Sequence, residues 1–232
     1  MMKLQKSGDR RYVRNGPQEM WMTFDQGNAA DPFHGGFRAL GLLNEVKLLP
    51  GTEFKVQSDG HQESVTYVRE GRLMLRQGPR RDDFLGPGCY QHANSPRTMV
   101  SGSLEQSRPQ GVHLFVSSLT PLRNEGESSF ERKHSPFSDR RGILRLIASP
   151  DGSAASLRLQ QDVRIYSSIL DRGNHVVHEL RPGRGAWLHV VAGRLRLADQ
   201  TLEAGDGVSL VDEPAISFTA QDSSEILLFD LA

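Results

Sequence analysis

Tyr67-Val-Arg-Glu-Gly-Arg-Leu-Met-Leu75 decides the fold of this 232-residue chain, because a second copy of it lies further along. His189-Val-Val-Ala-Gly-Arg-Leu-Arg-Leu197 matches it position by position, and in both copies a glycine separates two short runs. Short runs of alternating apolar and polar residues that turn at a glycine predict antiparallel strands. A repeated unit of this kind predicts one fold used twice, so we expect two small β-barrels in tandem.

The rest of the chain fits an all-β protein of short strands and tight turns. Glycine (23) and proline (12) are frequent, and few stretches show helical periodicity. Besides the first copy, strands are expected at residues 37–49, 52–56, 113–119, 143–149, 156–159, 163–170, 176–180, 208–211, 216–219 and 226–231, and those of the second copy at 186–191 and 195–198. The predicted domains are 1–119, with an extended lead-in that pairs with the first barrel, and 143–232. Residues 120–142, rich in Arg, Glu, Ser and Pro, form the predicted linker, with room for a short helix.

A polar stretch precedes the first copy and holds four of the candidate site residues. It runs from Gln57 to Glu63 and carries amide, carboxylate and imidazole side chains. From Pro50-Gly51 to the central glycine, the first copy is about ten residues longer than the second copy counted from Pro182-Gly183. This difference predicts that the second barrel lacks the polar loop and that any site belongs to the N-terminal barrel.

Charge and composition exclude several classes of protein. Lys and Arg number 28, Asp and Glu number 28, and the pI is about 7.1, so no basic surface for nucleic acid or anionic lipid is indicated. Neither a leader peptide pattern nor an apolar run of membrane-spanning length is found, and we expect a cytoplasmic protein. The single cysteine, Cys89, excludes an internal disulfide.

The two barrels resemble those of the pirin family of bicupins, in the cupin superfamily. The residues that carry the resemblance are Phe24, Asp31-Pro32, Gly36-Phe37, Leu43-Asn44, Pro50-Gly51, Val65–Gly71, Ser156–Asp162, Ala186–Val191, Ala204–Gly207 and Leu227–Leu231. The resemblance covers nearly the whole chain. It implies a tandem double-stranded β-helix, that is, two cupin barrels joined by a short linker in a monomer.

The resemblance also implies a metal site, which this chain alters. Pirin-like proteins typically bind iron through a His-x-His pair on the loop and a His-x-Glu pair after the next hairpin, and some oxidise flavonols such as quercetin. Counted from Glu63, the first pair falls on Gln57 and Asp59, and the second on Ser101 and Ser103. Because Fe(II) in oxygenases takes imidazole and carboxylate ligands, this set predicts a degenerate site. We therefore expect no cofactor, with iron or another divalent metal only if the family activity is retained.

The first functional hypothesis is a pirin-like protein that binds a small molecule or a protein partner in the emptied N-terminal pocket. No catalytic residue is assigned, because Ser101 and Ser103 lack both a paired base and a nucleophile-elbow context. The predicted pocket residues are Gln57, Asp59, His61, Glu63, Tyr67, His92, Ser101 and Ser103.

Two alternatives remain open. A quercetin 2,3-dioxygenase-like enzyme could use a substitute metal set of His61, Glu63 and His92, with Asp59 as a fourth donor; His61 and Glu63 would share one face of a strand. The competing interpretation, a solvated polar loop, is preferred. A thiol-based redox sensor could act through Cys89, although an inert, half-buried cysteine is the favoured interpretation.

Overall fold

The computed structural model describes residues 1–56, 62–75, 83–94, 100–103, 111–120 and 129–232. It is nearly all β, as predicted, with one short α-helix, α1 (Phe137–Arg140), and two 3₁₀ helices, Ser7–Asp9 and Ser153–Ala155, within the described ranges. Among these residues, no helix is long and apolar enough to cross a membrane. The chain divides into two compact units, of which one comprises residues 11–36 and 40–136 and the other residues 1–10, 37–39 and 137–232.

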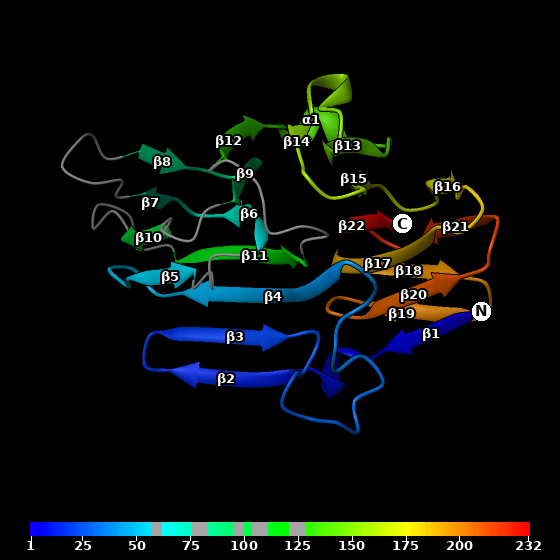
Figure 1. Cartoon of the computed structure of the whole chain (residues 1–232), viewed down its shortest axis with the longest axis horizontal. Coiled ribbons are helices and arrows are strands. Elements are labelled where there is room, and N and C mark those ends of the chain that lie inside the picture. The colour runs from blue at the N-terminus through cyan, green and yellow to red at the C-terminus, as the bar shows by residue number, and fades with distance from the viewer. Residues whose placement is uncertain (57–61, 76–82, 95–99, 104–110, 121–128) are drawn as a thin grey trace. The chain divides into compact units, whose positions relative to one another are not determined.

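The first unit, the N-terminal barrel, is built from a seven-stranded and a four-stranded sheet (Figure 1). The large sheet has the order β12 (Ser129–His134), β9 (Cys89–Asn94), β6 (Glu63–Glu70), β11 (Val112–Leu119), β4 (Leu40–Leu48), β3 (Gln18–Met22) and β2 (Arg11–Asn15). The small sheet has the order β5 (Phe54–Val56), β10 (Val100–Ser103), β7 (Leu73–Leu75) and β8 (Asp83–Leu85).

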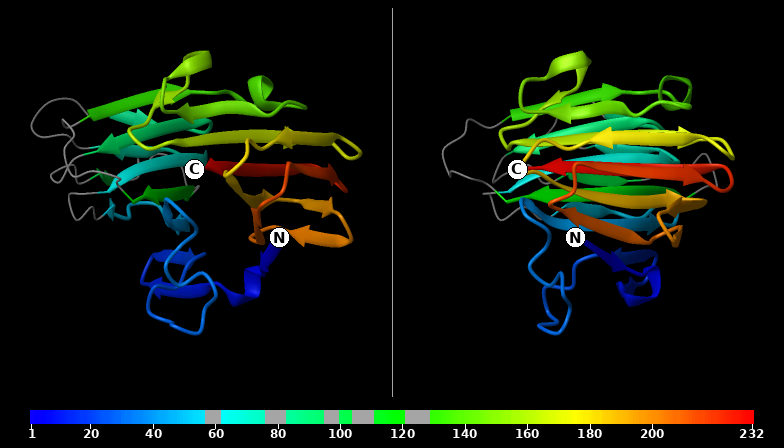
Figure 2. Two further views of the ribbon diagram at one scale, coloured as in Figure 1. Left: turned by 45° about the vertical axis from the view of Figure 1, so that its right-hand side comes forward. Right: turned by 90° about the vertical axis from the view of Figure 1, so that its right-hand side faces the viewer.

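The second unit, the C-terminal barrel, has the same design, and its last strand, red in Figure 2, runs between the yellow and orange strands. Its large sheet has the order β1 (Met2–Gln5), β20 (Gly207–Val211), β17 (Gly185–Ala192), β22 (Ser224–Leu231), β15 (Val163–Leu170), β13 (Arg145–Ser149) and β14 (Leu157–Arg158). Its small sheet has the order β16 (His175–Glu179), β21 (Ala215–Ala220), β18 (Arg194–Leu197) and β19 (Gln200–Glu203).

The internal repeat is confirmed, strand by strand. The first copy forms β6 and β7 and the second forms β17 and β18, and each long strand lies between equivalent partners in its large sheet. In each barrel, apolar side chains of the large sheet, such as Val68 or Leu188, pack against those of the small sheet, such as Leu73 or Leu195. The fold therefore follows from the alternating pattern, because one face of each strand enters this shared interior.

The predicted difference in loop length is wrong, because the two Pro-Gly turns are not equivalent. Pro50-Gly51 lies between β4 and β5, whereas Pro182-Gly183 lies between β16 and β17. The true counterpart of Gly51 is Gly173, which also has a positive φ and precedes the first strand of its small sheet. Counted from these glycines, the two copies reach their central glycines after the same number of residues.

Parts of the predicted lead-in and linker belong to other units of the structure than predicted. Residues Met2–Gln5 pair with β20 of the C-terminal barrel, and only β2 and β3 extend the first barrel, as Figure 1 shows. Residues Ser129–His134 of the predicted linker form β12 on β9. β1 and β12 form hydrogen bonds with the otherwise unpaired backbone edges of β20 and β9, which are equivalent strands of the two barrels. This pairing explains why these polar segments become strands. The short helix allowed for in the linker is α1.

A glycine corner joins the long strand of each large sheet to the small sheet. Gly71 and Gly193 both have φ of +79°, a conformation in which side-chain-bearing residues are strained. A Cβ atom at Gly71 would overlap the carbonyl oxygen of Gly111, and one at Gly193 would overlap that of Ser223. Glycine is therefore required at both corners for its backbone freedom and for its lack of a side chain.

We predict that Gly71→Ala and Gly193→Ala each lower the free energy of unfolding by about 3 kcal/mol, through strain and overlap together. Gly51→Ala and Gly183→Ala are matched controls, because these glycines have φ of +79° and +83° but no neighbouring atom where the alanine methyl group would lie. The controls should lose only about 1 kcal/mol. Urea unfolding measures the free energy of unfolding of all four variants. If the control variants lost as much stability as Gly71→Ala and Gly193→Ala, the role of the overlap would be contradicted.

Candidate functional site

The interior of the N-terminal barrel changes from apolar to polar along β6. Val68 belongs to the apolar core, so Thr66 and Ser64, two and four residues earlier, face the same interior. Strand register places Thr66 beside Gln91 of β9, and Ser64 beside Ser118 of β11. Neutral hydroxyl and amide groups therefore gather at this end of the barrel.

Two of these groups show how the polar end is arranged. The Ser118 hydroxyl donates to Oε1 of Gln62 at 2.6 Å. Gln91 is 1% exposed, and its Oε1 accepts no hydrogen bond from the described part of the chain. An unpaired buried acceptor costs about 1–3 kcal/mol. The interior thus keeps an acceptor that a bound hydrogen-bond donor could satisfy.

The C-terminal barrel fills the equivalent positions with apolar side chains. Ala186, Leu188 and Val208 belong to its core and stand where Ser64, Thr66 and Gln91 stand in the first barrel. The difference lies in side chains alone, because strand order and register are shared.

The mouth of the C-terminal barrel is closed by a group of charges. Asp230 takes the place of Ser118, and its carboxylate accepts hydrogen bonds from Nε of Arg184 and from Nε2 of His178, the latter at 3.0 Å. Arg184 also donates to Oδ1 of Asp162 at 2.9 Å, and the ring of Tyr166 packs on that of His178. These contacts link β15, β16 and β22 at the positions that Ser118 and Gln62 occupy in the first barrel.

Burial by itself raises the pKa of the Asp230 carboxyl group, but the hydrogen bonds from His178 and Arg184 outweigh burial. The pKa of Asp230 is consequently held below its usual value. His175, three residues before His178 on β16, is exposed, and its Nδ1 lies 2.9 Å from Oγ1 of Thr219.

Three of the predicted pocket residues lie on the opposite face of the large sheet. Glu63, Tyr67 and His92 alternate with the core-facing residues of β6 and β9. Glu63 and His92 are both buried, with 2.7 Å between Oε1 and Nε2, so the structure does bring this predicted pair together. Tyr67 stacks on Tyr90 with ring centroids 4.5 Å apart. Their membership of a pocket with the polar loop stays a prediction.

The remaining predicted residues cannot be placed in the same detail. Gln57, Asp59 and His61 lie outside the described residues, and Ser101 and Ser103 belong to β10, of which only the backbone is described. Within the described ranges, no three His, Cys, Asp or Glu side chains are grouped as metal ligands. Cys89 is half buried and packs against the apolar core.

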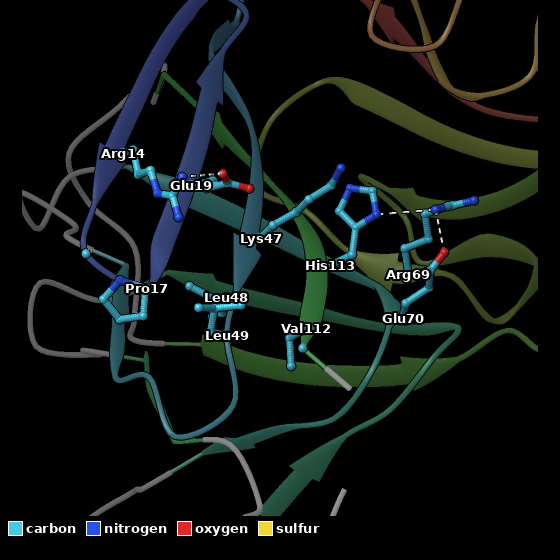
Figure 3. Close-up of a pocket in the computed structure, with 12 residues that line it drawn as sticks. Arg14, Pro17, Glu19, Lys47, Leu48, Leu49, Arg69, Glu70, Val112 and His113 are labelled. Atoms are coloured by element: carbon cyan, nitrogen blue, oxygen red, sulfur yellow. Dashed lines mark hydrogen bonds and ion pairs between the residues drawn. The ribbon is translucent and has the colours of Figure 1, made fainter. Parts of the chain in front are cut away.

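Sequence reasoning missed two features. Gln91 carries no signal of its own, since only strand register shows that it faces the interior. A cavity of about 460 Å³ lies at the other end of the large sheet, lined by residues that include Lys47, Arg69 and His113 (Figure 3). His113 stands in an apolar run, and its polar neighbours come from other strands.

Comparisons with known proteins agree with this fold. Residues 146–231 match the quercetinase C-terminal cupin domain. The chain is 29% identical over 231 residues to quercetin 2,3-dioxygenase of Escherichia coli K12, covering all of this chain and 99% of that protein. It is 28% identical over 208 residues to a pirin-like protein of Caulobacter vibrioides, with 87% of each covered. The crystal structure of the bacterial pirin YhhW from Escherichia coli in complex with nickel(II) superposes with a TM-score of 0.86 at 26% identity, covering 100% of this chain and 99% of that one.

We predict that acid weakens the closure of the C-terminal barrel. A carboxyl group whose pKa is lower in the folded than in the unfolded state stabilises the fold above its unfolded pKa, near 3.9, and this contribution is lost as pH falls through the folded pKa. Asp230→Asn should therefore destabilise the protein most at neutral pH, with a difference from wild type that shrinks below about pH 4. Unfolding free energies at pH 7, 4 and 3 measure this.

Asp222→Asn serves as the matched control, because Arg194 and nearby hydrogen bonds lower the pKa of Asp222 at an exposed position. Its effect should be small at every pH. A constant difference for Asp230→Asn across the pH range would contradict the assigned role.

Proposed function

We propose that this chain, which is a pirin-like bicupin, binds a small neutral molecule with hydrogen-bond donors in its N-terminal barrel and holds no iron tightly. The observation that carries the proposal is the polar interior around Gln91, whose buried Oε1 has no partner in the described part of the chain. The C-terminal barrel is the scaffold, since core side chains and the Arg184 cluster fill it.

The donor set argues against a resident metal. The four positions that correspond to the family ligands carry Gln57, Asp59, Ser101 and Ser103, and so provide one carboxylate but no imidazole. Amides and hydroxyls are weak ligands for Fe(II) or Ni(II), which favour imidazole in such sites. The Glu63–His92 pair is no substitute, because both side chains face away from the barrel core. These residues do not fit a tightly bound iron.

A second candidate function is flavonol oxidation. Relatives named quercetin 2,3-dioxygenase cover the whole chain, and the similar bacterial pirin was crystallised with nickel(II). This candidate requires a metal held by a ligand set other than the family one. The thiol-sensor hypothesis has less support, because the Cys89 side chain packs against apolar residues; Cys89→Ser should leave any response to peroxide unchanged.

We predict that Gln91→Met raises the free energy of unfolding by about 1 kcal/mol, because it removes an unpaired buried acceptor while filling a similar volume. Gln161→Met is the matched control: Gln161 is also buried but has interaction partners, so its replacement should destabilise. Urea unfolding of the two variants shows whether each substitution raises or lowers the free energy of unfolding. A loss for Gln91→Met as large as that for Gln161→Met would show that the Gln91 amide is already satisfied.

Metal binding tests the proposal directly. Protein incubated anaerobically with Fe(II), or with Ni(II), and then desalted should retain far less than one metal ion per chain and leave the quercetin spectrum unchanged. The variant Gln57→His/Asp59→His/Ser101→His/Ser103→Glu restores the family ligand set and should gain close to one metal ion per chain. One tightly bound metal in the wild type, together with quercetin turnover, would overturn the proposal in favour of the dioxygenase.

A further inference from the structure

The cavity in Figure 3 lies at the opposite end of the N-terminal barrel from its polar interior. The polar interior lies near the start of β6, whereas the cavity is lined by Arg69 and Glu70 at the end of that strand. Six residues of strand from Glu63 to Arg69 span about 20 Å. In addition, Lys47 and His113 alternate with the core residues Val46 and Leu114, so they project from the opposite face of the sheet.

A row of charged side chains crosses the sheet along one wall of this cavity. Strand register places Arg14 beside Glu19, Glu19 beside Lys47, and Lys47 beside His113, with Glu70 beside His113 on the far side. Figure 3 shows the Lys47 side chain extending toward the His113 ring. These groups come from five neighbouring strands, so the sheet itself fixes their spacing.

Two cations of this row have only loose partners. The closest carboxylate oxygen lies 3.8 Å from Nη1 of Arg14 and 3.9 Å from Nζ of Lys47, both beyond hydrogen-bond distance. Nζ of Lys47 also lies 5.0 Å from the centre of the Trp21 ring. Neither cation makes a hydrogen bond to a carboxylate of the described residues, so both can donate to an anion without breaking such a bond.

Both ring nitrogens of His113 lie close to side chains of neighbouring strands. Its Nδ1 lies 3.3 Å from Nη1 of Arg69, and its Nε2 lies 2.9 Å from Oε1 of Glu45. A carboxylate only accepts, so Nε2 of His113 donates to Glu45. Three cations, Arg14, Lys47 and Arg69, and two carboxylates, Glu19 and Glu70, line the cavity, so the charged lining residues carry one more positive than negative charge.

The other wall of the cavity is apolar. Pro17 and the exposed Leu49 line it, together with Leu48 and Val112, whose side chains belong to the apolar core of the barrel. A volume of about 460 Å³ falls within the usual range for small-molecule sites. A ligand that fits this combination has an apolar body and one acidic group.

We propose that this cavity binds small organic monoanions, namely carboxylates with an apolar body, with the carboxylate on Lys47 and Arg14 and the body on Pro17 and Leu49. A single negative charge neutralises the excess charge of the lining. A dianion would be repelled by Glu19 and Glu70, and a neutral molecule would leave the two cations without an acceptor. The site is independent of the barrel interior and its ligand.

The test uses benzoate, its neutral analogue benzamide and the dianion phthalate as probes, at constant ionic strength. Amide chemical-shift titrations of ¹⁵N-labelled protein give both the dissociation constants and the residues affected. We expect benzoate to bind at least about fivefold more tightly than benzamide or phthalate, with shifts centred on Leu48, Leu49 and Val112.

Lys47→Gln should raise the dissociation constant of benzoate about fivefold and leave that of benzamide unchanged. Arg14→Gln should act in the same direction. Lys3→Gln, a matched change at an exposed lysine of the C-terminal barrel, should change neither constant. Three results would each overturn the proposal. Benzoate and benzamide could bind equally well, Lys47→Gln could leave the dissociation constant of benzoate unchanged, or the chemical-shift changes could centre on Thr66 and Gln91. The last result would assign the probe to the barrel interior instead.

Discussion

Both barrels of this protein depend on one backbone constraint, a corner where the chain leaves the large sheet and enters the small one. Gly71 and Gly193 adopt the same positive φ, and in each case a carbonyl oxygen of a neighbouring segment occupies the space of a side chain. The close approach fixes where β6 ends against β11 and where β17 ends against β22. It therefore fixes which residues of these strands face the interior.

Because the backbone is shared, the two interiors differ through a few side chains. Leu188 and Val208 complete an apolar core in one barrel, while Thr66 and Gln91 keep the other polar. At the mouth, Asp230 and Arg184 form a buried ion pair where Ser118 and Gln62 form a neutral hydrogen bond. A buried charge pair is costly to open, because breaking it leaves an uncompensated charge. The C-terminal barrel thus suits a scaffold, and the N-terminal barrel suits ligand binding.

The sequence predicts the elements of the fold well, for a physical reason. Alternation and glycine turns are local signals, and β15, β11 and the two repeat hairpins lie where these signals place them. Pairing between distant segments is not a local property. Nothing near Met2–Gln5 indicates that these residues pair with β20, and two Pro-Gly turns look alike although they join different strands.

The site is harder to predict, because its residues are assembled by register. His92 and Glu63 do meet, as the sequence suggests, yet one-residue alternation places them on the face opposite Thr66 and Gln91. The cavity around Lys47 and His113 forms only when five strands pair in the correct register. The side chains of the family metal positions lie outside what the structure describes, so their chemistry still rests on residue type.

The central claim is that the N-terminal barrel offers neutral hydrogen-bonding groups to a ligand and does not hold a metal. Anomalous diffraction at the nickel edge, from crystals soaked in Ni(II), tests it most directly. The account predicts no anomalous peak inside the N-terminal barrel, with any nickel confined to exposed histidines such as His175. A strong peak coordinated by residues of the 57–61 and 101–103 segments would contradict it and establish a metal centre in this barrel.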